Sequence, residues 1–398
     1  MLRMDEHQRV DTTGDGGDPL PLDGVTVLDF SQFLAGPHCA LRLADLGARV
    51  VKIERPQGGD SGRDLALAGQ RFGDASALFH TINRNKESYA ADLKDADARE
   101  RIAALIRRAD VMIHNFRPGV MERLGLGYEA AAALNPRIVY AGVSGYGEEG
   151  PWRDRPGQDL LLQSLSGIAR LSGDRDQAPT PAALPIVDMA AGAQLAQGVL
   201  ALLVRRGVTG RGGRVDVSLL DAAIDLQFEP FTVFLNGGGA PQRGAVRNAN
   251  VYLGAPYGIY DTADGHVALA MMPVDRLGEV IGNDRLAHWP ADEWLDARDA
   301  IKAEIAAHLR ARPTADWLPA LQAAGLWAAE VLDWPTLVAQ PGFRALDPIQ
   351  TIGGGAETMR TTTCPIRIDG RRLRSSRPGP MLGEGNARID AELKGDGR

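Results

Sequence analysis

Short apolar runs alternate with helix-like segments along the first half of the chain. Residues 24–30 (GVTVLDF) form a β-branched run between a Pro/Gly-rich lead-in and a loop of small residues, which predicts a buried strand. Residues 40–46 have helical spacing, Gly47 suits the end of that helix, and residues 48–53 (ARVVKI) predict a second strand. Together these segments predict a β-α-β unit.

The same alternation continues as far as residue 206. It predicts an amphipathic helix at 97–108, strands at 110–114 and 137–143, and a long helix at 189–206. Such alternation is typical of a mostly parallel sheet with helices on both faces. The predicted fold class is therefore α/β.

The pattern changes after about residue 225. A glycine-rich loop at 236–247 (NGGGAPQRGAVR) precedes predicted strands at 258–261 and 266–271. A helical stretch follows at about 275–324, and short strand-like runs return at 353–372. We interpret this part of the chain as a second, smaller α+β domain.

Charge and cysteine content exclude several classes of function. The 44 Lys plus Arg against 51 Asp plus Glu give a net charge of -7, so no general attraction to nucleic acid is expected. Cys39 and Cys364 are the only cysteines, and the seven histidines form no HxH or HxxxH pair, so we expect no disulfide framework and no metal site. A reducing, cytoplasmic location fits this composition best.

The start of the chain and its most apolar helix give no sign of membrane targeting. Residues 1–19 are polar and lack the apolar region of a secretory signal, so we predict a disordered lead-in. The longest apolar candidate, Ala190 to Val204, is interrupted by Gln194 and Gln197. No membrane partner is expected.

Polar and basic residues follow several of the predicted strands, at the edge where open α/β sheets bind ligands. The loop at 31–37 (SQFLAGP) follows the first strand, but without a GxGxxG pattern its small residues alone favour close helix packing. Arg55 follows the second strand, and in isolation it reads as part of a solvated charge cluster. Further basic residues follow other strands, so that together they favour a pocket for a phosphorylated cofactor: Arg63, Arg84, Lys86, Arg117 and Arg123.

Four aspartates are candidates for covalent or acid-base chemistry. Asp174 and Asp176 lie in an irregular Gly/Pro-bounded loop at 172–181, where a carboxylate can act as a nucleophile. An aspartate in a turn more often binds its own backbone, so the residues alone favour that structural role. Asp159 and Asp188 each precede a predicted helix and fit N-terminal caps.

Nine segments, in order, resemble the family III CoA-transferases (CaiB/BaiF-like), the group containing formyl-CoA transferase, carnitine CoA-transferase and 2-methylacyl-CoA racemase. The resemblance covers roughly residues 21–389. It is carried by PLDGVTVLDFSQFLAGP, LADLGARVVKIERPQGGD, NRNKESYAADLK, ADVMIHNFRPGVMERLG, NPRIVYAGVSGYGEEGPW, RPGQDLLLQSLSG, SGDRDQAPTPAALPIVDMAAG, TGRGGRVDVSLLDA and PGPMLGEGN.

The resemblance implies roles for individual residues. The family's nucleophilic aspartate matches Asp176 in GDRDQAPTP, while Asp159, Asp174 and Asp188 stay open as residues that share the catalytic role. The resemblance implies that Arg55 contacts the phosphates of coenzyme A and that Arg84, Asn115 and Arg123 line its nucleotide end. It places Phe33 and Ala35 beside the pantetheine or thioester and Tyr146 near the acyl group.

The implied reaction moves CoA from an acyl-CoA donor to a carboxylic acid acceptor through an aspartyl anhydride and an aspartyl-CoA thioester. Coenzyme A is then a substrate, and no cofactor is permanently bound. The alternative is a racemase or epimerase of the same family, which needs a histidine where this chain has Gln158. Leu34 replaces a glutamine of formyl-CoA transferase, which disfavours a small polar acid such as oxalate.

Two other classes of function differ from a transferase in what they require of the sequence. A CoA-binding protein without turnover would bind CoA but never acquire a thioester on Asp176. A nicotinamide-dependent oxidoreductase is disfavoured because the glycine fingerprint is missing.

The resemblance also implies an architecture. It has a Rossmann-like large domain at 20–225 that is completed by the C-terminal return at 336–398, a small domain at 226–335, and a homodimer of interlinked rings. No segment of this chain is matched to the glycine-rich lid of formyl-CoA transferase, since NGGG at 236–239 lies at a different point in the sequence.

Overall fold

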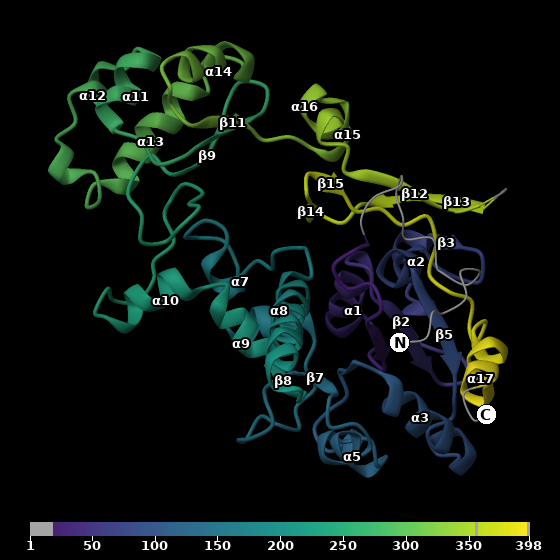
Figure 1. Cartoon of the computed structure of the whole chain (residues 1–398). Helices are drawn as coiled ribbons and strands as arrows, with labels where there is room; N and C mark the ends of the chain where they lie inside the picture. Colours follow the sequence, from purple (N-terminus) through teal and green to yellow (C-terminus); the bar gives the residue numbers. More distant parts are fainter. Residues whose placement is uncertain (1–18, 355–356, 396–398) are drawn as a thin grey trace. The chain divides into compact units, whose positions relative to one another are not determined.

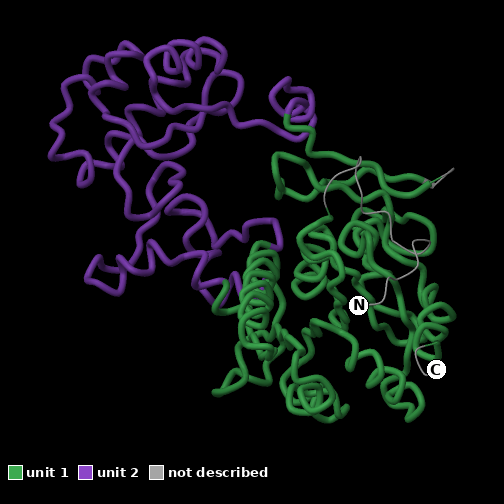
Figure 2. The backbone as a smooth tube through the Cα atoms, in the orientation of Figure 1, with its two compact units in different colours: residues 1–159, 186–222, 346–398 green, residues 160–185, 223–345 purple. Residues whose placement is uncertain are grey.

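The computed structural model describes residues 19–354 and 357–395, so residues 1–18 of the predicted lead-in lie outside the described part. The chain divides into two units (Figure 2). Unit 1 takes the chain up to Asp159, Ile186–Ala222 and the part from Leu346 onward; unit 2 takes Leu160–Pro185 and Ala223–Ala345. The segment Leu160–Pro185, which was predicted to belong to the large domain, thus groups with the second unit.

Unit 1 is built on a sheet of six parallel strands in the order β5-β2-β1-β6-β7-β8. Its strands are β1 (Thr26–Asp29), β2 (Arg49–Glu54), β5 (Lys86–Ala90), β6 (Val111–His114), β7 (Val139–Ser144) and β8 (Gly213–Ser218). The central strands are buried almost throughout because helices cover both faces. The predicted α/β fold with a parallel central sheet is confirmed.

Two sets of helices cover this sheet (Figure 1). One set contains α1 (Ala35–Asp45) and α8 (Ile186–Thr209), and the other contains α3 (Ala96–Arg108), α5 (Tyr128–Leu134) and α17 (Asn386–Gly395). The second set forms a core with the strands, in which Ile102, Ile106, Tyr140 and Ile389 are at most 1% exposed. The unit also contains α2 (Ala77–Asn83), α4 (Val120–Arg123), β3 (Arg71–Phe72), β4 (Ala75–Ser76) and two 3-10 turns, Ser61–Arg63 and Leu67–Gly69.

The helices α1 and α8 approach each other closely at Gly192. A Cβ atom at this position would lie 2.5 Å from the carbonyl oxygen of Ala35 and 2.8 Å from Nδ1 of His38, which no side chain permits. By length and composition α8 alone among the described helices is apolar enough to cross a bilayer. It packs on α1, β7 and β8, and a single helix that passes this test of length and composition is weak evidence of a membrane span.

The C-terminal part of the chain returns to unit 1. Asn386 pairs with both backbone groups of Ala90, and the hydroxyl of Tyr89 donates to Asp390 at 2.7 Å. These contacts fix α17 beside β5, the edge strand of the sheet (Figure 1). Before α17 this part forms two hairpins, β12 (Ile349–Gly354) with β13 (Glu357–Thr362) and β14 (Arg367–Ile368) with β15 (Arg371–Arg372).

Unit 2 contains an antiparallel sheet in the order β11-β10-β9. Its strands are β9 (Gly258–Asp261), β10 (His266–Leu269) and β11 (Ala328–Glu330). Leu277, Ile301, Ile305 and Leu321 are fully buried in the core against this sheet. The helices of unit 2 are α6 (Asp159–Leu165), α7 (Ile168–Leu171), α10 (Phe228–Leu235), α11 (Val274–Ile281), α12 (Asp284–Ala287), α13 (Arg298–Leu309), α14 (Thr314–Ala323), α15 (Trp334–Ala339) and α16 (Pro341–Leu346), with a 3-10 turn at Ala291–Glu293. Helix α9 (Leu219–Asp225) crosses the boundary, because unit 1 ends at Ala222 and unit 2 resumes at Ala223.

Candidate active site

The loop between β1 and α1 is held by side chains from two other segments of the chain. Asn115, which follows β6, accepts a hydrogen bond from the backbone N–H of Gln32 at 2.9 Å and donates to its carbonyl at 2.7 Å. Phe33 has a left-handed backbone with φ 63°, and its N–H donates to Asp60 at 3.2 Å. Because a phenylalanine in this conformation is strained, the hydrogen bonds on both sides are needed to keep the loop in place.

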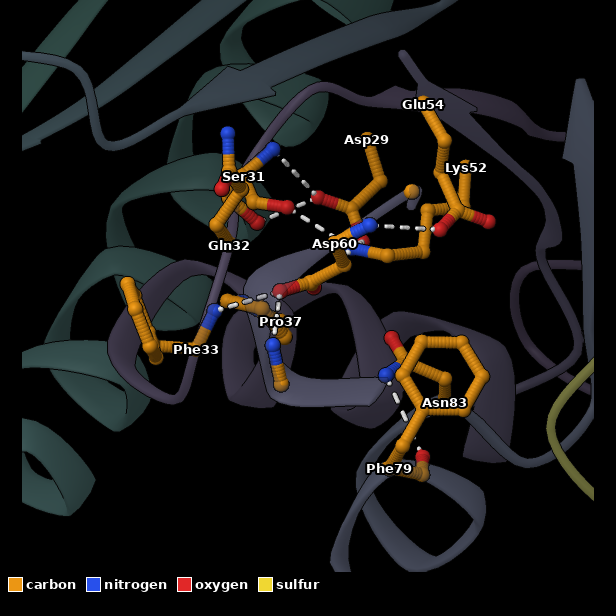
Figure 3. Close-up of polar contacts among 12 residues, drawn as sticks. Asp29, Ser31, Gln32, Phe33, Pro37, Lys52, Glu54, Asp60, Phe79 and Asn83 are labelled. Atoms are coloured by element: carbon orange, nitrogen blue, oxygen red, sulfur yellow. Dashed lines mark hydrogen bonds and ion pairs between the residues drawn. The ribbon is translucent and has the colours of Figure 1, made fainter. Parts of the chain in front are cut away.

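A cluster of buried charges lies beneath this loop (Figure 3). The Lys52 ammonium contacts Asp60 at 2.8 Å and donates to the carbonyl of Ser31 at 2.7 Å. The Lys86 ammonium donates to Asp29 at 2.9 Å and to the carbonyl of Pro37 at 3.0 Å. The two lysines thus bind carbonyl groups at the two ends of the loop, and each lysine also pairs with a buried carboxylate.

Burial and pairing act in opposite directions on these groups. Burial raises the pKa of Asp29, but the Lys86 and Lys52 charges outweigh it and the net pKa is lowered. Burial lowers the pKa of Lys52, yet the Asp29, Asp60 and Glu54 carboxylates raise it above its usual value. Burial lowers the pKa of Lys86 to about 8 in spite of its contact with Asp29.

A second buried ion pair continues the cluster. Arg63 forms two parallel hydrogen bonds to Glu54, at 2.8 and 2.7 Å, and its guanidinium lies 3.9 Å from the ring centre of Phe79. Glu54 also accepts from the backbone N–H of Asp60 at 2.9 Å. This pair therefore fixes Asp60, which in turn fixes Phe33 and Lys52.

A pocket of about 230 Å³ opens beside the cluster, at the carboxyl ends of the strands. It is lined by the apolar residues Phe30, Ile53, Ala91, Leu93, Phe116 and Leu124, by Gly59, and by the polar or charged residues Ser31, Gln32, Lys52, Glu54, Arg55, Asp60, Asp92 and Lys94. Lys52 is already paired with Asp60, so the exposed cations of this pocket are Arg55 and Lys94. Apolar walls with two exposed cations suit a ligand that combines a ring with anionic groups.

A larger hollow of about 760 Å³ lies near the amino ends of β7 and β8, and none of the predicted site residues lines it.

Several of the predicted site residues lie together at this edge of unit 1. Arg55 lines the pocket and donates to the carbonyl of Gly59 at 2.9 Å. Phe33, which is 53% exposed, belongs to the loop above the charge cluster, and Ala35 begins α1. Asn115 contacts Gln32, a lining residue.

Arg84 is placed differently from the prediction. Its guanidinium is buried and donates to both carboxylate oxygens of Asp45, at 3.0 and 2.9 Å. It does not line the pocket, and its contacts are those of a structural ion pair. The sequence could not show this, because the NRNK segment passes from α2 into β5 and only the fold decides which way each side chain turns.

Arg123 and Tyr146 lie near the same sheet edge without lining the pocket. Arg123 ends α4 and is exposed, next to the lining residue Leu124. Tyr146 follows β7, donates to the carbonyl of Pro156 at 3.4 Å and packs edge-on against Trp152. Lys94, which lines the pocket, was not predicted from the sequence, although its position shortly after a predicted ligand-binding segment was a usable signal.

Asp176 lies in unit 2, in the loop between α7 and α8. It is exposed, and no hydrogen bond or ion pair of its carboxylate is found in the described residues. Asp174, two residues earlier, is only partly exposed. A free, exposed carboxylate is available for nucleophilic attack.

Asp159 and Asp188 form a pair of acids in unit 1. Asp159 accepts hydrogen bonds from the N–H groups of Val187 and Asp188, in the first turn of α8, at 2.8 and 3.0 Å. Asp159 was expected to cap the helix that follows it in sequence, but these hydrogen bonds are made to N–H groups of α8. Burial, with a smaller effect of the Asp159 charge, raises the pKa of Asp188 to about 7.

No group of three or more His, Cys, Asp or Glu side chains within residues 19–354 and 357–395 is arranged to hold a metal ion.

The family of the chain is decided by comparison with known proteins. The model of CoA-transferase family III matches residues 22–386. The chain belongs to CoA-transferase family III. This family III chain is 34% identical to the acetyl-CoA:oxalate CoA-transferase of Acetobacter aceti over 382 residues, covering 94% of the chain and 96% of that protein. It is 31% identical to the succinate–glutarate CoA-transferase of Agrobacterium fabrum over 390 residues, with 94% and 96% coverage.

Solved structures of family III proteins have the same fold. The crystal structure of Rv3272 from Mycobacterium tuberculosis superposes with a TM-score of 0.81 at 32% identity, covering 94% of this chain and 100% of that one. A CaiB/BaiF family protein from Brucella suis also gives 0.81, at 31% identity with 94% and 100% coverage. The resemblance described from the sequence segments is confirmed.

Proposed function

We propose that this family III enzyme transfers CoA between carboxylic acids with Asp176 as the covalent carrier. The observation that carries the proposal is the exposed carboxylate of Asp176, which no described residue pairs or hydrogen-bonds. Surface aspartates in irregular loops usually bind their own backbone, so an exposed carboxylate without such a bond is more consistent with a role in chemistry. The relatives named above are acyl-CoA:carboxylate CoA-transferases, which supports the same reaction class.

Each proposed step exchanges one acyl bond for another. An oxygen of Asp176 attacks the donor thioester, the C–S bond breaks, and a mixed anhydride and CoA thiolate result. The thiolate attacks the Asp176 carbonyl, releasing the donor acid and leaving an aspartyl-CoA thioester. The acceptor carboxylate attacks this thioester, and the freed thiolate then attacks the acceptor's acyl carbon, which regenerates Asp176. No water, proton or oxidant enters the balance.

The pocket in unit 1 is the proposed site for the nucleotide end of CoA. Phe30, Phe116 and Leu124 offer apolar walls for a ring, and Arg55 and Lys94 offer cations for the phosphates. Phe33 and Ala35 are assigned to the pantetheine or thioester part, Asn115 and Arg123 to the nucleotide end, and Tyr146 to the acyl group. Arg84 is left out of this assignment because its guanidinium is buried against Asp45.

The acceptor is proposed to be a carboxylic acid larger than oxalate. The relatives include transferases named for oxalate, glutarate and D-citramalate, so the family uses short acids of several lengths. Leu34, an apolar residue in the first loop, disfavours the smallest and most polar of them. Gln158 disfavours the racemase alternative because an amide cannot take up an α-proton.

The test uses the intact protein and its covalent state. Wild-type enzyme is incubated with a panel of acyl-CoAs, trapped with hydroxylamine or borohydride, and mapped by peptide mass spectrometry. We expect modification at Asp176 and loss of both adduct and transfer in Asp176→Ala, by about 10³-fold or more in kcat.

The matched control is Asp174→Asn, in the same loop, which should keep both the adduct and at least a tenth of the activity. A protein that binds acyl-CoA tightly without any adduct, and that exchanges an α-proton in deuterated water, would be a racemase instead.

We also propose that the enzyme is a homodimer. In α10 the apolar side chains of Phe228, Phe234 and Leu235 are 69%, 46% and 65% exposed. Three neighbouring large apolar residues at this exposure are unusual on a monomer surface and favour a protein interface.

A further inference from the structure

The large hollow at the amino ends of β7 and β8 is rich in arginine, although the protein as a whole is acidic. Its volume is about 760 Å³, and α5, the end of α8 and the start of β8 border it (Figure 1). Sites for organic ligands have volumes of about 300–1,000 Å³, so the hollow has room for more than an inorganic ion. Its polar lining residues are Tyr128, Arg205, Thr209, Arg211 and Arg214.

We propose that this hollow is a second anion-binding site of unit 1 and that its ligand is an organic phosphate. Arg205 and Arg211 bind the phosphate groups, and Tyr128 and Arg214 donate further hydrogen bonds. The site is distinct from the pocket at the carboxyl ends of the strands. The inference goes beyond the proposed function, because it does not depend on which residue carries the acyl group.

The segment that forms most of the lining concentrates positive charge. Residues 205–214 (RRGVTGRGGR) contain four arginines and no acidic residue, although the whole chain has a net charge of -7. Neither Arg205 nor Arg211 forms an ion pair with a residue that the structure describes, and both are exposed. Their charges are thus not neutralised by a described residue, and they attract an anion from solution.

The other two arginines of this segment are compensated within the protein. Arg206 pairs with Asp110 at 2.9 Å and does not line the hollow. Arg214 pairs with Asp216 at 2.7 Å and with Glu148 at 3.2 Å. Because these two carboxylates offset its charge, Arg214 contributes hydrogen-bond donors to the site but little net attraction.

The Arg205 side chain is held in place by the glycines that follow it. Its guanidinium donates to the carbonyl of Gly212 at 2.8 Å. A Cβ atom at Gly213 would overlap this guanidinium, and one at Gly212 would overlap the carbonyl of Ile138. The two glycines therefore keep open the space that Arg205 occupies, and one cation of the site is fixed before a ligand binds.

Two lining groups make no polar contact that would explain them as parts of the fold. The Arg211 side chain has no hydrogen bond or ion pair with a described residue. The Tyr128 hydroxyl also has no hydrogen-bond partner among those residues, while its ring lies 5.8 Å from that of Tyr140 between centres. Both groups line the same hollow as Arg205, so their donors are available to one ligand.

The chemistry of these donors favours a phosphate ester over a simple carboxylate. A guanidinium presents its N–H groups in a planar fork that matches the oxygens of a phosphate. Two uncompensated cations, Arg205 and Arg211, match the two or more negative charges of a phosphate ester. A monocarboxylate would neutralise only one of them.

The hollow lies at the opposite end of the sheet from the pocket proposed for CoA. Pro136, shortly before β7, and Gly213, the first residue of β8, line the hollow. The CoA pocket instead follows the carboxyl ends of β1 and β2. Since β7 has six residues and each advances the strand by about 3.3 Å, the two ends of the sheet are roughly 20 Å apart. A ligand in the hollow therefore does not displace acyl-CoA.

Arginine labelling of the full-length protein tests the site at residue resolution. Exposed arginines are modified with phenylglyoxal and quantified by peptide mass spectrometry, with pyrophosphate as the probe. Pyrophosphate should protect Arg205 and Arg211, and less so as the ionic strength rises. Arg344, an exposed arginine of α16 in unit 2, is the internal control and should stay reactive.

Variants of Arg211 test the contribution of its charge. In Arg211→Ala, the pyrophosphate concentration that protects Arg205 should rise about tenfold, the effect of losing one charge-assisted hydrogen bond. In Arg211→Glu the increase should reach about 100-fold or more. Since the Arg211 side chain is exposed and without described contacts, both variants should fold. The matched control Arg344→Ala should behave as wild type.

Two further comparisons identify the ligand and the site. ADP should protect Arg211 at about tenfold lower concentration than inorganic phosphate, because the hollow has room for the rest of the nucleotide. Equal protection by both overturns the assignment to an organic phosphate. Arg55→Ala, in the proposed CoA pocket, should leave the protection of Arg211 unchanged, and its loss there would place the anion in that pocket and overturn the second site.

The remaining outcomes are equally decisive. If neither pyrophosphate nor ADP protects Arg211 in the wild-type protein, the hollow is not an anion site. Protection of Arg205 that is unchanged in Arg211→Glu also overturns the proposal. These results are independent of whether an aspartyl adduct forms, so failure of the proposed function and failure of this inference are distinguishable.

Discussion

Four charged side chains, Asp29, Lys52, Asp60 and Lys86, are buried beneath the first loop at no more than 2% exposure. Removing charges from water is costly, so a buried pair adds little net stability, but deleting one partner leaves the other uncompensated at a cost of about 3–5 kcal/mol. The value of this cluster lies in position: each lysine binds one carboxylate and one carbonyl of the loop. The strained backbone of Phe33 is thereby kept in a single conformation.

A buried histidine makes stability depend on pH. Burial lowers the pKa of His114 from 6.5 to about 4, so the folded protein keeps it neutral while the unfolded chain takes up a proton below pH 6.5. Stability from this residue is therefore present above pH 6.5 and is lost as the pH falls toward 4, by up to about 3 kcal/mol. The raised pKa of Asp188 has the opposite effect on stability between pH 4 and 7. The pH dependence of wild-type stability therefore does not report His114 alone.

The difference between wild type and His114→Phe isolates the histidine. Phenylalanine keeps a ring against Tyr140, whose centre lies 5.1 Å from that of His114, and does not titrate. Urea unfolding between pH 4 and 7 should show the variant gaining stability relative to wild type as the pH falls. A constant difference across this range would contradict the assigned pKa.

At the scale of single residues, the sequence predicts some roles and not others. Arg55 was found because a basic residue directly after a strand must lie at the carboxyl edge of the sheet. Arg84 could not be placed in the same way, because only the fold shows that its side chain turns inward to Asp45. Lys94, which lines the pocket, was not predicted although it follows a predicted ligand-binding segment. Arg243, in a glycine-rich segment, donates a hydrogen bond to the carbonyl of Ser172, which lies more than 60 residues away in the chain. No local sequence pattern reveals this contact.

At the scale of elements, the buried strands were the most predictable feature. β-branched runs predicted β1, β2, β6 and β7 to within a few residues, because a strand covered on both faces must be apolar throughout. The start of α1 was predicted too late, at residue 40, whereas the helix begins at Ala35 with Pro37 in its first turn. Proline is tolerated there because the first N–H groups of a helix have no partner within it.

Two glycines of α8 provide a prediction with an internal control. Gly192→Ala would force the new methyl group against Ala35 and His38 of α1, and we expect a loss of about 1–3 kcal/mol in unfolding free energy. Gly207→Ala meets nothing within 4 Å and should be neutral or stabilise by up to about 1 kcal/mol, since alanine favours a helix. Denaturant titration of both variants measures the difference, and equal effects would mean that α1 and α8 are not in close contact.

At the scale of the whole molecule, the proposed homodimer makes a prediction. Sedimentation should give twice the chain mass of 42.5 kDa. The variant Phe228→Glu with Phe234→Glu places two charges on the exposed face of α10 and should weaken association by about 10²-fold or more if this face is buried between subunits. The exposed control Leu67→Glu should stay dimeric. A wild-type monomer at micromolar concentration would contradict the proposal.

The division of the chain was only partly predictable. The change of pattern near residue 225 agrees with the boundary at Ala223, and the return after Leu346 comes ten residues later than the predicted start at 336. Leu160–Pro185 was assigned to the large domain because it lies between two segments of it in sequence. Its attachment to unit 2 depends on contacts such as those of Arg243, which join residues distant in the chain.

The return of the chain to unit 1 has a consequence for its synthesis. On the ribosome, the strands of the sheet emerge long before α17, whose Ile389 and Asn386 complete the core and the edge at β5. Until those last residues are made, the nascent sheet has an uncovered apolar patch and an open edge, both of which attract other chains. Correct production of this enzyme therefore depends on protecting an unfinished first domain through translation of the entire second one.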